Sequence, residues 1–206
     1  NNGLGVRGDL RAVVKTILTH AEAKQRTDKA GKVREPILRM TAAWRGVGVT
    51  SVSGHYGVDN TDDTANALGQ SLLRAPSVFN FYRPGFKAPG SFSAAAGLVA
   101  PELQILHETS AAGYVNFLYG ALRFGAGKDP LSETYYDVRF DTSGLDALAS
   151  DVPALVDTIN KKLFYGTMSA ALNQELQTAL GGVELSLRVK SALLLALASS
   201  EYQVQP

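Results

Sequence analysis

The chain has 206 residues, of which 45% are hydrophobic and 19% are charged, and this size suits one domain with a substantial core. Its formal net charge of +1, without a run of Lys or Arg, gives no electrostatic signature of a nucleic-acid-binding protein or of a basic face for an anionic membrane. The absence of cysteine excludes disulfides, thiolate catalysis and cysteine-ligated zinc.

The start of the chain predicts two amphipathic helices. Asp9 suits the N-cap of a helix over residues 9–23, in which apolar residues recur every three or four positions. Pro36 suits the first turn of a second helix, which ends in a glycine-rich stop near Gly46. Each helix is expected to bury one face.

The next stretch predicts a loop followed by a third helix. Residues 49–60 combine Ser, Gly and Val without a helical period, which is typical of a loop. The acidic residues behind Asn60 and Thr61 suit the N-terminus of a helix that runs towards Leu73. The same acidic run lacks the glycine and the glutamate that a calcium-binding loop requires, so helix capping explains it better.

The longest apolar pattern predicts the helix around which the fold is organised. Pro101 suits the first turn of a helix over about 102–124, which is apolar on more than one face and is expected to be buried on several sides. After it, Tyr136, Val138 and Phe140 alternate with polar residues. This alternation predicts at most a short β hairpin or edge strand near 134–141.

Three helices are expected to complete the chain, over residues 152–165, 169–180 and 183–199, and the short glycine-containing links between them favour antiparallel neighbours. The fold class is therefore all-α, an irregular helical bundle around one central buried helix. Residues 1–206 are expected to form a single helical domain. No apolar run approaches the ~20 residues that a membrane-spanning helix needs.

Residues 68–86, LGQSLLRAPSVFNFYRPGF, bring four aromatic rings into one short segment. Such rings dominate the energetics of the core or groove that they face. Arg74 and Arg83 flank the rings. A planar guanidinium suits a buried carboxylate, for which Glu102 and Glu108 are the candidates. A structural clamp and a substrate-binding arginine both fit this pattern, and the clamp is the commoner use.

Common hydrolase, nucleotide and dinucleotide signatures are absent, so the sequence leaves open whether the protein is an enzyme. The three histidines lie too far apart for a local metal-binding pair, and His107 fits a core histidine better than a base or a ligand. We expect no cofactor and no metal. The candidate binding residues lie beside the aromatic rings or along the polar line of the 102–124 helix: Arg74, Asn80, Tyr82, Arg83, Glu102, His107, Glu108 and Asn116.

Six stretches resemble one known family in their order along the chain: GDLRAVVKTIL, VREPILRM, LRAPSVFNFYRP, GLVAPELQI, YVNFLY and ALASSEYQVQP. Together they are similar to the latter half of domain of unknown function 1800. The resemblance implies a large exported bacterial protein, periplasmic or extracellular, without an established activity. It also implies a longer amino-terminal half before Asn1. Near the end, Ser200 and Glu201 depart from the family, which has a proline after its double serine.

Two functions remain open from the sequence. The first is an interaction or scaffold module that associates with an N-terminal fragment of the same protein or with another exported protein, and the apolar stripe of the 9–23 helix would then face that partner. The alternative is an enzyme or a carbohydrate-binding protein with an aromatic- and arginine-lined groove at residues 79–83. The two differ in whether the rings lie in the core or in a cleft.

Overall fold

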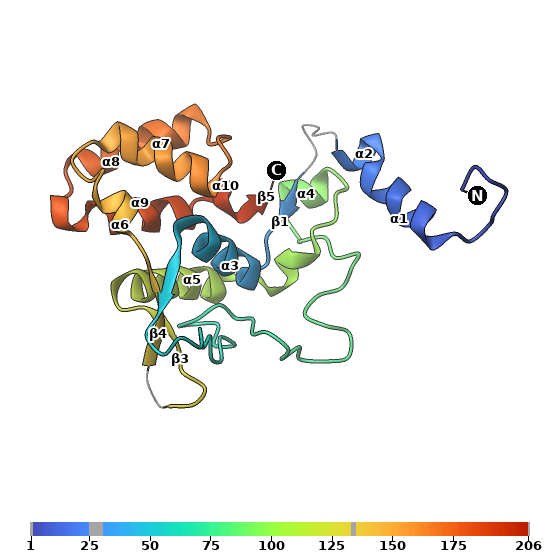
Figure 1. The fold of residues 1–206 in the computed structure, drawn as a ribbon, viewed down its shortest axis with the longest axis horizontal. Helices are drawn as coiled ribbons and strands as arrows, with labels where there is room; N and C mark the ends of the chain where they lie inside the picture. The colour runs from blue at the N-terminus through green and yellow to red at the C-terminus, as the bar shows by residue number, and fades with distance from the viewer. Residues whose placement is uncertain (1, 25–30, 133–134, 206) are drawn as a thin grey trace. The chain divides into compact units, whose positions relative to one another are not determined.

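The computed structural model describes residues 2–24, 31–132 and 135–205. The chain divides into a small amino-terminal unit, Asn1–Lys32, and a large unit, Val33–Gln205 (Figure 1). Within the described residues, no helix has the length and apolar character that crossing a bilayer requires.

The small unit contains α1 (Leu10–Thr19) and α2 (Ala21–Lys24). The predicted N-cap is confirmed, because the Asp9 carboxylate accepts the backbone N–H groups of Arg11 at 3.0 Å and Ala12 at 3.2 Å. The helix predicted over residues 9–23 is interrupted at His20, and none of the side chains of α1 is buried.

The large unit is mostly helical, which confirms the all-α class. Three of its helices, α7, α8 and α9, pack against one another, and α9 also packs against α5. Its helices are α3 (Pro36–Val47), α4 (Phe92–Ala95), the 3-10 helix Pro101–Ile105, α5 (Glu108–Arg123), α6 (Ser143–Asp146), α7 (Val152–Leu163), α8 (Ala170–Gly181), α9 (Leu185–Ala198) and α10 (Ser200–Gln203).

The helix predicted over 102–124 begins at Glu108 instead of residue 102. Residues Pro101–Ile105 form a separate 3-10 helix, and His107 then starts α5 as its N-cap. The helix is also less enclosed than predicted, because it buries Tyr114 and Leu118 on one face while Tyr119 on the other is 51% exposed. In α9, by contrast, the core positions share near-zero exposure: Val189, Ala192, Leu193, Ala196 and Leu197.

A three-stranded antiparallel sheet has the order β2-β4-β3, formed by β2 (Val49–Ser51), β4 (Tyr135–Phe140) and β3 (Ala126–Lys128). The strand predicted near 134–141 is confirmed for Tyr135–Phe140, although β4 is the middle strand and not an edge, and residue 134 lies outside the described residues. The loop predicted from residue 49 begins later, because β2 pairs with β4. A second sheet joins β1 (Lys32–Val33) and β5 (Val204–Gln205).

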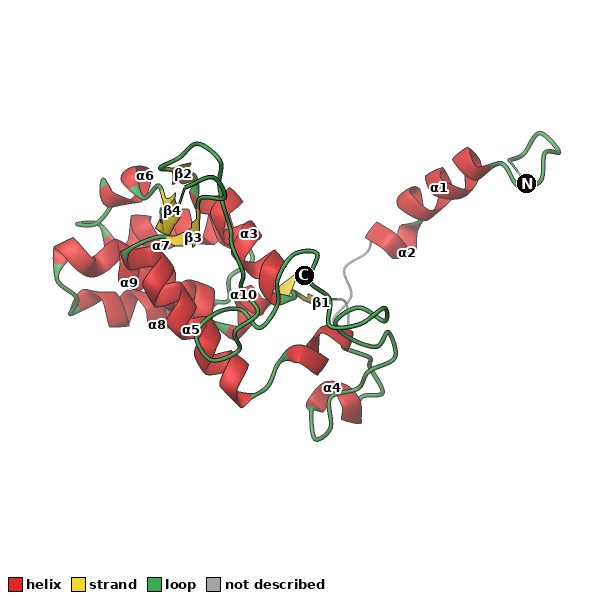
Figure 2. Cartoon of the chain, turned by 90° about the horizontal axis from the view of Figure 1, so that it is seen from below, coloured by secondary structure: helices red, strands yellow, loops and turns green. Residues whose placement is uncertain are grey.

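Between β2 and α5 the chain is mostly irregular, as the long loops in Figure 2 show. The helix predicted from Asn60 or Thr61 towards Leu73 is wrong, since these residues form turns and bends. Asp63 accepts the N–H groups of Ala65 and Asn66, at 2.8 and 3.2 Å, in a local turn that competes with a helix.

Candidate functional site

Three of the four predicted aromatic residues, Phe79, Phe81 and Tyr82, line an open groove, and none of the four lies in the buried core. This groove, which we call the aromatic groove, has a volume of about 790 Å³. Its walls combine rings with polar groups: Pro76, Ser77, Phe79, Asn80, Phe81, Tyr82, Arg83, Pro84 and Gln104. The structure therefore brings three of the predicted binding residues together, namely Asn80, Tyr82 and Arg83.

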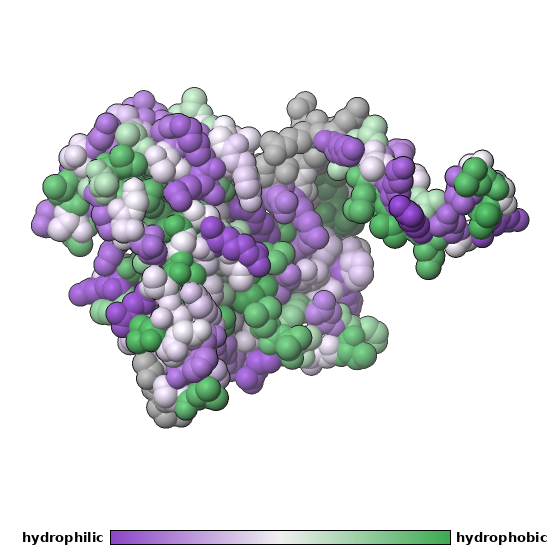
Figure 3. Space-filling model, viewed as in Figure 1, coloured by the Kyte–Doolittle hydropathy of each residue, from purple (hydrophilic) through white to green (hydrophobic). Residues whose placement is uncertain are grey.

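Large apolar side chains also lie at the surface of the irregular stretch that contains the groove. Figure 3 shows such side chains gathered over the loops between β2 and α5. Phe79 is 81% exposed and Phe92 is 96% exposed. We call this set of residues the apolar loop surface: Leu72, Leu73, Val78, Phe79, Phe92, Leu98 and Val99, all of which are exposed.

The groove is fixed to the start of α3 by polar contacts, most of them partly buried. The Glu35 carboxylate accepts hydrogen bonds from Tyr82 Oη at 3.0 Å and from Gln70 Nε2 at 2.6 Å. Gln70 Oε1 in turn accepts the N–H of Ile37, at 3.0 Å, in the first turn of α3. Burial raises the pKa of Tyr82 to about 12, and the hydrogen bond to Glu35 acts in the same direction. We call Glu35, Gln70 and Tyr82 the polar anchor.

A second tie holds the groove near the 3-10 helix. The N–H of Arg83 donates to Gln104 Oε1 at 2.7 Å. Asn80 has a positive φ of 67°, which Asn tolerates better than most residues, and its N–H donates to Ser77 O at 3.1 Å. Both contacts involve backbone N–H groups, so they set the path of the chain and leave the side chains of Asn80 and Arg83 at the groove.

Arg74 pairs with a carboxylate other than the two that the sequence analysis proposed. Arg74 forms its ion pair with Asp62, at 3.1 Å, and not with Glu102 or Glu108. Both side chains of this pair are substantially exposed, so the pair contributes little stability. Glu102 is buried close enough to Tyr82 to contribute to its raised pKa.

His107 and Glu108 lie at the start of α5. The prediction of a core histidine is wrong, because His107 is exposed and its Nδ1 accepts the N–H of Ser110 at 3.4 Å as a helix cap. Both residues line a pocket of about 430 Å³ beside Arg39. Asn116 is exposed farther along the helix and lines neither this pocket nor the aromatic groove.

Arg39 is a buried cation that the sequence did not single out. Its guanidinium lies 4.5 Å from the centroid of the Tyr114 ring, and Nη1 donates to Gln203 Oε1 at 3.2 Å. In the described part of the chain, Nε and Nη2 have no hydrogen-bond partner. Burial lowers the pKa of Arg39. The ring face therefore provides the main compensation for this charge.

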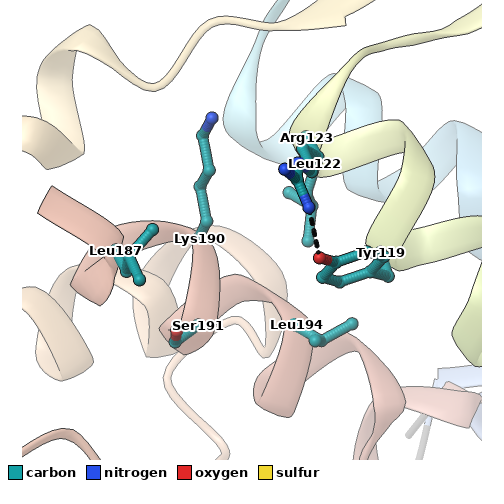
Figure 4. A pocket seen from close by; sticks show the side chains of 7 residues that line it. All are labelled: Tyr119, Leu122, Arg123, Leu187, Lys190, Ser191 and Leu194. Carbon is teal, nitrogen blue, oxygen red and sulfur yellow. Dashed lines mark hydrogen bonds between the residues drawn. The ribbon is translucent and has the colours of Figure 1, made fainter. Parts of the chain in front are cut away.

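A third pocket, of about 410 Å³, lies between α5 and α9 (Figure 4). The α5 wall carries Tyr119, Leu122 and Arg123, and Figure 4 shows the hydrogen bond that Arg123 donates to the hydroxyl of Tyr119. The α9 wall completes the lining: Leu187, Lys190, Ser191 and Leu194. We call this cavity the α5–α9 pocket.

The loop after β2 is organised by buried carboxylates that sequence reasoning also missed. Asp137 accepts the N–H groups of Ser53 and Gly57, both at 2.8 Å. Burial alone would raise the pKa of Asp137, but these donors outweigh it and lower the pKa to about 2. His55 Nδ1 lies 2.9 Å from Asp129 Oδ1. The imidazole of His55 is about half exposed, whereas the Asp129 carboxylate is buried. No local spacing signals these contacts, since His55 and Asp129 are 74 residues apart.

Over residues 2–24, 31–132 and 135–205, no group of three or more His, Cys, Asp or Glu side chains is arranged to hold a metal ion.

Comparison with family models identifies the family of this chain. The model of the family described as Protein of unknown function (DUF1800) matches residues 3–204, which is nearly the whole chain. No curated protein and no solved structure matches.

Proposed function

The chain belongs to the DUF1800 family, as its sequence stretches predicted, and from that premise we propose that it is an interaction module that binds a partner protein through the apolar loop surface. The observation that carries this proposal is the exposure of large apolar side chains on one continuous stretch, residues 72–99. The proposed partner is another segment of the same protein or a second exported protein.

The apolar loop surface has the features of a binding site. Contiguous exposed apolar side chains on a folded unit typically mark interaction surfaces, and aromatic residues often dominate the binding energy. The stretch is also held in place by the polar anchor and by the bond from Arg83 to Gln104. A surface that is already ordered loses less conformational entropy when it binds.

The setting of this interaction is part of the proposal. The family resemblance implies an exported bacterial protein, so we propose a periplasmic or extracellular location. Fractionation of the source cells, with an antibody to the chain, tests this location. Signal confined to the cytoplasmic fraction would contradict the location but would not contradict the proposed interaction.

The interaction is tested by photo-crosslinking in cells that produce the full-length protein. A photoreactive phenylalanine derivative replaces Phe79, which is 81% exposed in the apolar loop surface. The matched control carries the same group at Tyr165, an aromatic residue that is 66% exposed after α7. We expect position 79 to crosslink to one defined protein or segment, and position 165 to give no such product.

Two outcomes decide the proposal. For the first, the photoreactive group is placed at Val78, which lies in the same surface. If Phe79→Ser together with Phe92→Ser removes the crosslink formed from position 78, the apolar loop surface is the binding face. If position 79 gives no product, or the same products as position 165, the surface does not bind a protein partner and the proposal is wrong.

A second candidate is carbohydrate binding in the aromatic groove, with or without catalysis. The observation that favours it is the groove itself, where Phe81 and Tyr82 are half-buried beside Arg83. Sugar rings stack on such faces, and arginine donates to hydroxyl groups. Isothermal titration with cellotetraose and chitotetraose tests this candidate. Saturable heat that Tyr82→Ala abolishes would support it, and the absence of heat with both sugars would count against it.

A further inference from the structure

The α5–α9 pocket combines apolar walls with two cationic side chains on opposite sides. Lys190 rises from α9 and Arg123 from α5, and Leu187 and Leu194 lie along the α9 wall (Figure 4). Its volume of about 410 Å³ lies within the range of about 300–1,000 Å³ that small-molecule sites occupy. Both walls are long helices, so the lining is already in place before a ligand arrives.

Within the described residues, the two cations have no acidic partner. None of the 7 lining residues is Asp or Glu. In the part of the chain that the structure describes, neither Lys190 nor Arg123 forms an ion pair. The positive potential at this opening is therefore not cancelled locally, which favours an anion there.

Arg123 is held in position by its neighbours. Its Nη1 donates to Tyr119 Oη at 2.7 Å, and its guanidinium lies 5.0 Å from the centroid of the Phe124 ring. A guanidinium carries five N–H donors, so this single hydrogen bond leaves others available to a ligand. The fixed geometry suits a carboxylate, which can accept two of them.

The apolar part of the pocket gives the second half of the ligand's chemistry. Leu122 is buried at the α5 wall, Leu194 is half-buried, and Leu187 is exposed. An alkyl or aromatic body that covers these side chains removes apolar surface from water. A fully polar anion would leave that surface exposed and gain only the charge contacts.

We propose that the α5–α9 pocket binds a small amphipathic carboxylate, with the apolar body against Leu187 and Leu194 and the carboxylate between Lys190 and Arg123. This site lies on helices outside residues 72–99, so it does not depend on the proposed protein interaction. The main competing explanation is that the alkyl stems of Lys190 and Arg123 merely cover leucine side chains. Head-group dependence of binding separates the two.

The experiment titrates the purified chain with octanoate, 1-octanol and octylammonium, which share an alkyl tail and differ in charge. Backbone amide shifts in nuclear magnetic resonance locate the binding site. We expect saturable shifts at residues 119–123 and 187–194 with octanoate, affinity about fivefold weaker for 1-octanol, and no saturable shifts with octylammonium. Octanoate affinity falls as salt is added, because exposed charge contacts are screened.

Variants test the residues. Lys190→Gln together with Arg123→Gln is expected to weaken octanoate about fivefold or more, while Lys161→Gln, an exposed lysine on α7, leaves it unchanged. Both replaced side chains are exposed, so the fold is expected to tolerate the change. Ser191→Phe fills the pocket and is expected to abolish the shifts, with thermal unfolding as the check on its fold.

Three results would overturn the inference. One is equal affinity for octanoate and 1-octanol, which removes the role of the cations. Another is octanoate shifts confined to residues 72–99, which places the ligand on the apolar loop surface. The last is unchanged octanoate affinity in the Lys190 and Arg123 double variant.

Discussion

The carboxyl-terminal helices and the irregular stretch between β2 and α5 are held together in different ways. In α7, α8 and α9, stability comes from fully buried aliphatic side chains such as Leu155, Leu180 and Leu193. In the irregular stretch, Leu68 is buried in the core, but most of the large apolar side chains are exposed and several contacts to the rest of the unit are polar, such as Gln70 to Ile37. The carboxyl-terminal helices bury their apolar side chains, whereas the irregular stretch leaves many of its apolar side chains exposed.

This difference predicts how each region responds to substitution. Truncation in the helices should reduce global stability through lost burial and a cavity. Changes in the irregular stretch should act through individual hydrogen bonds and close backbone contacts, with smaller and more local effects. The expected effects below run from the largest to the smallest.

Leu193→Ala should have the largest effect, because Leu193 is completely buried at the centre of α9. We expect a loss of about 2–5 kcal/mol in the free energy of unfolding, measured by urea denaturation. Leu195→Ala is the matched control on the same helix, since Leu195 is 41% exposed, and should cost much less. Similar losses at the two positions would show that α9 is not enclosed as described.

Gln70→Ala should come next, because Gln70 is buried and joins Glu35 to the backbone N–H of Ile37. Its removal leaves the Ile37 N–H without its acceptor and Glu35 without one donor. We expect a loss of about 1–3 kcal/mol. Gln174→Ala, at an exposed position of α8, is the control. A loss no greater than that of the control would mean that the irregular stretch is not fixed through Gln70.

Two glycines of α5 give a third test of the comparison. A Cβ at Gly113 would overlap the backbone carbonyl of Thr64, whereas a Cβ at Gly120 meets nothing nearby. Gly113→Ala should therefore destabilise by about 1–3 kcal/mol through overpacking. Gly120→Ala should stabilise by about 0.5–1 kcal/mol, because Ala is the better helix former.

Thermal unfolding of the two glycine variants side by side gives the measurement. Opposite signs would show that the irregular stretch lies directly on α5. Stabilisation by both substitutions would show that the Thr64 backbone is not seated against the helix.

The smallest effect is expected for Tyr82→Phe, which removes one hydrogen bond to Glu35 and keeps the ring. We expect a loss of about 0.5–1.5 kcal/mol, at the low end because Tyr82 is partly exposed. Tyr56→Phe, at an exposed loop position, serves as the reference. A loss as large as that of Leu193→Ala would contradict the distinction between the two regions.

The sequence predicted the helical region well because its signals are local. Pro36 opens α3, Asp9 caps α1 and Ser169 caps α8 within a few residues of the helices that they start. In α3 the period of apolar residues also marks the buried face, whereas the apolar stripe of α1 is exposed. Such signals need no knowledge of the rest of the chain.

The irregular stretch was harder to predict because its contacts are distant in sequence. Gln70 and Ile37 are 33 residues apart, and nothing near either residue marks the pair. The wrong helix towards Leu73 followed from acidic residues that cap a local turn, where Asp63 binds Ala65 and Asn66. The groove at residues 79–83 was predictable in composition, but the polar anchor that positions it was not.

The bond between Ile37 N–H and Gln70 Oε1 makes one amide of α3 report on a loop far away in sequence. That amide lies in the first turn, where no helical carbonyl can accept it. Its exchange with deuterated solvent therefore depends on how often the irregular stretch opens. A molecule bound at the apolar loop surface would slow exchange at Ile37 without contacting it. The exchange rate of this one amide proton therefore reports how often the irregular stretch opens.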